Sequence, residues 1–144
     1  TRAKAAQVLA LAGSKEASAA LAKALEDGDE ETKRAILTAV GERKTGGLED
    51  AVAALAKTDP AWAVRVRATE TLGKIGGARK DDAIKVLAEI AKKDAYALVR
   101  ETALVSAHAL DPAAARGLVT DLSKNDAENR VRETATKLLG AKAP

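Results

Sequence analysis

A repeated phrase constrains this chain more than any other feature of its sequence. Around residue 64 it reads Val-Arg, then Ala68, then Leu72-Gly73. The same order of apolar, basic and small residues returns at Val99-Arg100, 35 residues later, and at Val131-Arg132, another 32 residues on. Upstream, Thr32-Lys33 and Thr1-Arg2 begin similar phrases. Self-similarity at a period of about 20–50 residues is typical of repeat architectures, so the chain is predicted to stack copies of one small unit.

Each phrase predicts an α-helix, because Val64, Ala68, Leu72 and Ile75 recur at the spacing of one helical face. We name these the B helices. Four more amphipathic segments, the A helices, lie between them. They carry Leu21 and Leu25; Leu48, Val52 and Leu55; Ile84, Leu87 and Ile90; and Leu118, Val119 and Leu122. No segment has the alternation of a strand, so two helices form each unit.

Proline, aspartate and glycine mark the expected helix ends. Asp59-Pro60 and Asp111-Pro112 predict an N-capping carboxylate followed by proline at the first helical position. Asp94 and Asp126 occupy the same place as Asp59. Glycines are expected to end the B helices or to mark the passage into the next A helix: Gly41, Gly73, Gly140, Gly46-Gly47 and Gly76-Gly77.

A period of 31 to 35 residues with Asp before Val-Arg, then Ala and Leu-Gly, resembles the HEAT repeat, particularly the short bacterial form also found in phycobilisome lyases. The resemblance covers the full chain and implies an all-α fold. That fold would be an α-solenoid of stacked antiparallel helix pairs, a right-handed superhelix of about nine helices. Residues 1–144 would form one domain, the C-terminal fragment of a longer protein. It would begin with a B helix at 1–13 and continue with repeats at 14–45, 46–77, 78–110 and 111–144.

Composition limits the chemistry available to the chain. It has no cysteine, which excludes disulfides, thiolate zinc sites and cysteine nucleophiles. Lys plus Arg number 24 against 21 for Asp plus Glu, and both signs are interleaved, so nucleic acid is not the favoured partner. No apolar run approaches the roughly 18 residues of a membrane span.

No residue is assigned to catalysis, a cofactor or a metal. His108 is the sole histidine, it has no HExxH motif around it, and it is expected to be a helix-end residue. Glu30-Glu31 and Asp81-Asp82 each open a predicted helix, where carboxylates meet the helix dipole favourably. No phosphate-binding loop or nucleophile elbow is present, so the sequence predicts that the chain is not an enzyme.

A basic residue stands at the second position of every phrase: Arg2, Lys33, Arg65, Arg100 and Arg132. The HEAT resemblance implies that this residue pairs with an aspartate of the same or a neighbouring repeat, here Asp59, Asp94 and Asp126, as a structural ladder. The alternative interpretation is a row of cations lining a groove for phosphates or acidic peptides.

Two sets of residues are candidates for binding a protein. Trp62 and Tyr96, the only aromatics, fall in the first turns of successive B helices, where they form an interaction anchor or else cover their own A–B turns. The B helices are expected to line the inner, concave face. Their outward positions form the second set: Arg34, Thr38, Arg67, Glu70, Lys74, Glu101, Val105, Glu133 and Lys137.

The sequence therefore predicts a non-catalytic HEAT-repeat scaffold whose partner is another protein or another domain of its own chain. One alternative is a C-terminal domain appended to a larger bacterial enzyme, such as a zinc aminopeptidase or a bilin lyase. A third hypothesis, DNA binding in the manner of HEAT-like alkylpurine glycosylases, is disfavoured because this sequence lacks their basic concave face and aromatic-lined pocket.

Overall fold

The structure is a computed structural model that describes residues 15–140. These residues form eight α-helices and one short 3-10 helix, whereas the helix expected at 1–13 lies outside the described residues. The α-helices are α2 (Lys15–Asp27), α3 (Glu30–Arg43), α4 (Glu49–Thr58), α5 (Trp62–Ile75), α6 (Lys80–Lys93), α7 (Ala97–Leu110), α8 (Pro112–Asn125) and α9 (Asn129–Gly140); η1 is Gly76–Arg79.

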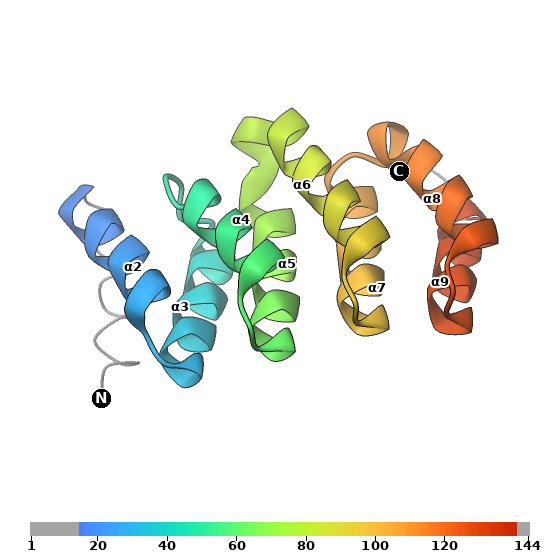
Figure 1. Ribbon diagram of the computed structural model, residues 1–144. Helices are drawn as coiled ribbons and strands as arrows, with labels where there is room; N and C mark the ends of the chain where they lie inside the picture. Colours follow the sequence, from blue (N-terminus) through green and yellow to red (C-terminus); the bar gives the residue numbers. More distant parts are fainter. Residues whose placement is uncertain (1–14, 141–144) are drawn as a thin grey trace.

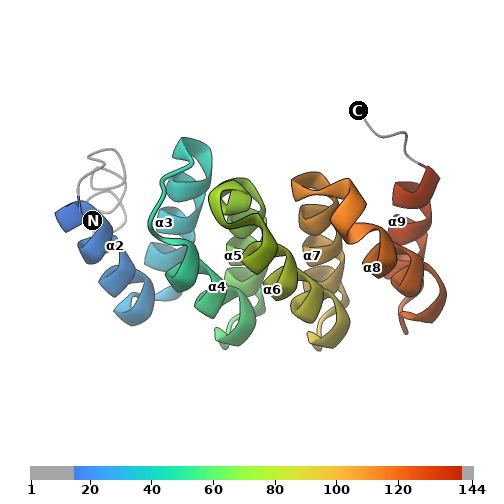
Figure 2. The same ribbon diagram turned by 90° about the horizontal axis from the view of Figure 1, so that it is seen from above.

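The helices form antiparallel pairs that follow one another in a single row (Figure 1). Helices α2, α4, α6 and α8 are the A helices, and α3, α5, α7 and α9 are the B helices. Each A helix contacts the A helix of the next pair, and each B helix contacts the next B helix. Figure 2 shows the resulting two layers. The predicted all-α solenoid of stacked helix pairs is confirmed.

Small apolar side chains between the two layers make one continuous core. The predicted B-helix face is buried in α5, where Val64 and Ala68 are fully buried and Leu72 is 1% exposed. In α7, Leu104 is fully buried. Because a single pair cannot cover its own apolar face, the core is built from contacts between neighbouring pairs, as in other linear arrays.

Two predicted helix-ending glycines instead allow B helices to approach one another. Gly41 and Gly73 lie inside α3 and α5, two residues before these helices end. A Cβ atom at Gly73 would lie 2.8 Å from the Cβ of Ser106 on α7, so the missing side chain permits the α5–α7 contact. Gly47, with a φ of +85°, makes the turn between α3 and α4 as expected, since only glycine adopts this conformation without strain.

Gly73→Ala should therefore destabilise the chain by about 1–3 kcal/mol, the usual cost of overpacking. Gly77→Ala is the matched control, because nothing lies within 4 Å of a Cβ placed there. Urea unfolding followed by circular dichroism compares the two variants. Equal stability of both would show that the α5–α7 contact does not depend on the glycine.

Candidate functional site

Three ion pairs connect each helix pair to the next along one line of the array. The basic side chain comes from a B helix and the carboxylate from the A–B turn of the following pair. The pairs are Lys33 Nζ with Asp59 Oδ2 at 2.8 Å, Arg65 Nε with Asp94 Oδ2 at 2.9 Å, and Arg100 Nε with Asp126 Oδ2 at 2.9 Å. The aspartate is thus always that of the neighbouring repeat.

The guanidinium of Arg100 binds the turn of the next repeat and the turn of its own repeat. Its Nη2 also donates to Asp126 Oδ1 at 3.0 Å, and its Nη1 donates to the carbonyl of Asp94, in the turn before its own helix, at 2.9 Å. The hydrogen bond to Asp126 raises the pKa of Arg100. Burial alone would raise the pKa of Asp126, but the bonds from Arg100 and from the Glu128 N–H outweigh it and lower that pKa. Both groups are therefore held in their charged forms.

The prediction that Asp59, Asp94 and Asp126 are N-caps is wrong. Each lies at the C-terminal end of an A helix, and its Oδ1 accepts the backbone N–H two residues later, from Ala61, Tyr96 and Glu128 respectively. The B helices α5 and α7 begin three residues after the aspartate, too far for its side chain to reach their first turns as a cap, and neither has a side-chain cap. These carboxylates shape the turn and bind the ladder cation.

Two other aspartates do cap helices. Asp111 accepts the N–H of Ala114 and precedes Pro112 at the start of α8, as predicted. Asp29 accepts the N–H of Thr32 at 2.8 Å and caps α3, which the sequence analysis missed. The signal was present as an aspartate one residue before the acidic pair Glu30-Glu31.

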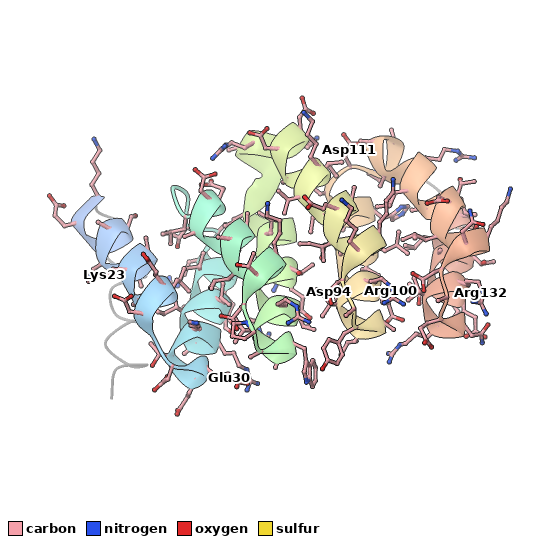
Figure 3. The ribbon with its side chains drawn as sticks, in the orientation of Figure 1. Lys23, Glu30, Asp94, Arg100, Asp111 and Arg132 are labelled. Carbon is pink, nitrogen blue, oxygen red and sulfur yellow. The ribbon has the colours of Figure 1, made fainter. Side chains whose placement is uncertain are left out.

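Arg132, the last basic residue of the repeated phrase, has fewer partners than Arg100. Arg132 Nη1 donates to the carbonyl of Asp126 at 2.6 Å, repeating the bond that Arg100 makes to Asp94. Within residues 15–140 no salt bridge is formed by Arg132. Figure 3 labels Asp94, Arg100 and Arg132 on this line. Three of the basic residues are thus paired with a carboxylate of the next repeat.

The two aromatic side chains lie together at the edge where A helices turn into B helices. Trp62 is the first residue of α5, and Tyr96 immediately precedes α7 rather than lying in its first turn. Their ring centroids are 6.2 Å apart with the planes tilted by 34°. The Arg65 guanidinium lies 5.4 Å from the centre of the Tyr96 ring. Because Asp94 holds Arg65, this cation–π contact fixes the tyrosine to the ladder.

Both rings remain largely open to solvent, although their contact covers part of each. Trp62 is 46% exposed and Tyr96 is 51% exposed. Val105 on α7 is 42% exposed, and Leu139 on α9 is the fourth exposed large apolar residue of the described chain. Of these four residues, Trp62 and Val105 lie on the two central B helices, and Tyr96 immediately precedes α7.

Val66 and Glu70 follow Trp62 on α5 at spacings of four residues. Val66 is half-buried against the core, whereas Trp62 is exposed. Glu101 and Val105 have the same spacing on α7. We call this area, made of Trp62, Val66, Glu70, Tyr96, Glu101 and Val105, the α5–α7 surface. The aromatic pair and part of the predicted outward set thus belong to the same two B helices and the turns before them.

Charged residues occur both within the α5–α7 surface and among the other predicted outward residues. Glu70 accepts a bond from Arg67 at 3.4 Å, and Glu101 pairs with Arg130 of α9 at 3.1 Å. Arg34 is exposed and lies 3.9 Å from Glu30. Thr38 is half-buried and bonds to its own helix, whereas Lys74, Glu133 and Lys137 are exposed. An apolar centre with a charged rim is the usual composition of a protein interface.

Residues considered for chemistry do not converge. His108 lies beside Pro112, Arg116 and Leu139 in a hollow without a carboxylate in its lining. Glu30-Glu31 and Asp81-Asp82 lie in the first turns of α3 and α6. In the described part of the chain, no group of three or more His, Cys, Asp or Glu side chains could hold a metal ion. No helix among these residues is long and apolar enough to cross a membrane.

The family model for HEAT repeats matches residues 1–58 and 47–108. The chain belongs to the HEAT-repeat family. A comparison with curated proteins finds no match.

The HEAT-repeat model ends at residue 108, but the array does not. The Arg100–Asp126 pair joins α7 to the α8–α9 turn with the same geometry as the Arg65–Asp94 pair one repeat earlier. HEAT repeats generally serve as scaffolds for protein interactions, a property of the family that leaves the partner of this member undefined.

Proposed function

We propose that this HEAT-repeat chain is a non-catalytic scaffold that binds another protein through the α5–α7 surface, with Trp62 and Tyr96 as the anchor. One observation carries the proposal: the only two aromatics of the sequence meet on the outside of the array, each about half exposed. Tryptophan and tyrosine are enriched among the interface residues that contribute most to affinity.

The anchor is also held in position before any partner arrives. The Arg65 contact and the bond from the Tyr96 N–H to Asp94 both restrict the tyrosine, and Trp62 rests against it. A surface that is ordered in advance loses less conformational entropy on binding. Flanking charges of both signs suit a protein with complementary charges better than a polyanion.

Affinity capture from the lysate of the source organism tests the proposal. We expect a protein that resists nuclease treatment to be retained by the native chain, and Trp62→Ala/Tyr96→Ala to weaken its binding at least about 30-fold, since hot-spot truncations cost about 2 kcal/mol or more each. Leu139→Ala is the matched control, because Leu139 is an exposed apolar residue on α9. Retention that disappears with nuclease, or that survives the double substitution unchanged, would contradict the proposal.

A further inference from the structure

Helices α8 and α9 form one end of the row in Figures 1 and 2, and no further helix of the described chain follows them. Arg130 and Thr134 of α9 both donate to Glu101 of α7, at 3.1 and 3.2 Å. That side of α9 therefore faces the preceding pair. Three residues at helical spacing lie on the opposite side of α9, which we call the end face: Arg132, Thr136 and Leu139.

The end face occupies positions that are buried in every earlier B helix of the described chain. The equivalent residues are Leu37, Thr69 and Leu104, four residues after the ladder cation, and Val40, Leu72 and Ala107, seven residues after it. Thr71 of α5 donates to the Leu37 carbonyl at 2.9 Å, so the first of these positions meets the next B helix. On α9, by contrast, Thr136 is exposed and Leu139 is 37% exposed. The end face thus has the residue types of a stacking surface but is open to solvent.

Arg132 repeats part of a bonding pattern that Arg65 and Arg100 show in full. In those two residues Nη1 donates to the carbonyl six positions earlier, while Nε and Nη2 both donate to the aspartate of the next turn. Nη1 of Arg132 makes the same carbonyl bond. Its Nε and Nη2 donate to no residue among 15–140, and Asp126 of its own turn is bound by Arg100. Two N–H groups of one guanidinium commonly bind a carboxylate together, so Arg132 presents a carboxylate site at the end face.

A hollow beside the end face lies where the A helix of a further pair would pack. The corner next to Leu72, between α4 and α5, is lined by Ala83 and Val86 of α6 and leaves a space of about 40 Å³. The corresponding corner next to Leu139, between α8 and α9, is a hollow of about 270 Å³. Arg116 of α8 is exposed and lines this hollow. A helix placed here as α6 is placed against α4 and α5 would fill it.

We propose that the end face binds a helix pair of a second protein whose inter-helix turn carries an aspartate. The carboxylate would bind Nε and Nη2 of Arg132. The first helix would fill the hollow beside Arg116, and the second would pack on Thr136 and Leu139. This inference goes beyond the proposed function, because the aromatic anchor takes no part in it.

The donors of Arg132 decide the chemistry of the partner. A guanidinium donates hydrogen bonds and accepts none, so its complement is a carboxylate. Glu128 and Glu133 lie near Arg132 in sequence, but neither forms a salt bridge with it. A second copy of this chain is a poorer match, because its ladder aspartates are bound within their own array: Asp59, Asp94 and Asp126.

A display library of helix pairs with randomised turns, selected on the native chain, supplies the test. Enriched pairs should carry aspartate in the turn. Their affinity, measured by isothermal titration calorimetry, should fall at least about 30-fold in Arg132→Ala, because the partner's carboxylate is left unpaired in the interface. Thr136→Lys should also weaken binding, since its longer side chain obstructs the second helix. Lys137→Ala is the matched control, because it removes an exposed cation that follows Thr134 by three residues, on the side of α9 toward α7, and it should not change affinity.

The outcomes separate this inference from the proposed function. Selection without enrichment, enriched turns without a carboxylate, or affinity unchanged in Arg132→Ala would overturn the inference. Tighter binding in Thr136→Lys would also overturn it, since it would indicate general attraction of acidic peptides. So would self-association of the native chain that is lost in Arg132→Ala, because the occupant would then be a second copy. Binding should survive in Trp62→Ala/Tyr96→Ala; its loss there would place the pairs on the α5–α7 surface, against this inference but in keeping with the proposed function.

Discussion

Replacing Arg100 with alanine should lower the free energy of unfolding by about 3–5 kcal/mol, because removing one member of a buried ion pair leaves the other without compensation. The Asp126 side chain is only 4% exposed and receives two bonds from this guanidinium. The same substitution removes the bond to the Asp94 carbonyl. Urea unfolding followed by circular dichroism measures the loss.

Arg132→Ala is the matched control for this measurement. Arg132 occupies the same position in its repeat, but it makes a single backbone bond and no ion pair with the described residues. We expect a loss below about 1 kcal/mol, as for an ordinary hydrogen bond. Similar losses in both variants would mean that the ladder carboxylates do not hold the repeats together.

Leu104→Ala should destabilise the chain by about 2–5 kcal/mol, the usual cost of removing a large apolar side chain from a packed core. Leu104 is fully buried on α7, among the largest fully buried side chains of the core. The loss should appear in the same urea unfolding experiment.

Its neighbour Val105 provides the comparison. It follows Leu104 on the same helix and is 42% exposed, so Val105→Ala should change stability by no more than about 0.5 kcal/mol. A comparable effect of the two substitutions would contradict the assignment of Val105 to the outer surface of α7.

The buried side of the fold was predictable from sequence because it depends on periodicity. The spacing of Val64, Ala68 and Leu72 is enough to assign one face of α5, and the repeat at Val99 and Val131 extends the assignment along the array. A repeat architecture turns one correct helix assignment into several, since every unit buries the same positions against its neighbours.

The turn aspartates were misassigned for a local reason. Whether a carboxylate caps a helix depends on which residue is the first helical one, and that position shifts by a few residues without any change in the apolar pattern. Two residues separate Asp59 from Trp62, where α5 begins, so its Oδ1 accepts the Ala61 N–H instead. The role of Gly73 in the contact between α5 and α7 could not be predicted from the sequence either, because its neighbour Ser106 lies on another helix.

The candidate surface was only partly predictable. The sequence singles out Trp62 and Tyr96 by their rarity, but their contact depends on the offset between two repeats of different length, 32 and 35 residues from phrase to phrase. Which charged side chains are paired depends on contacts between different helices, such as that of Arg130 with Glu101.

The emission of Trp62 in the presence of the captured partner tests the central claim most directly, because this is the only tryptophan of the chain. An anchor that becomes buried moves from water into an apolar interface. The account predicts emission at shorter wavelength and less quenching by acrylamide at saturating partner. Unchanged emission and quenching at saturation would show that the partner binds elsewhere and would contradict the assignment of the α5–α7 surface.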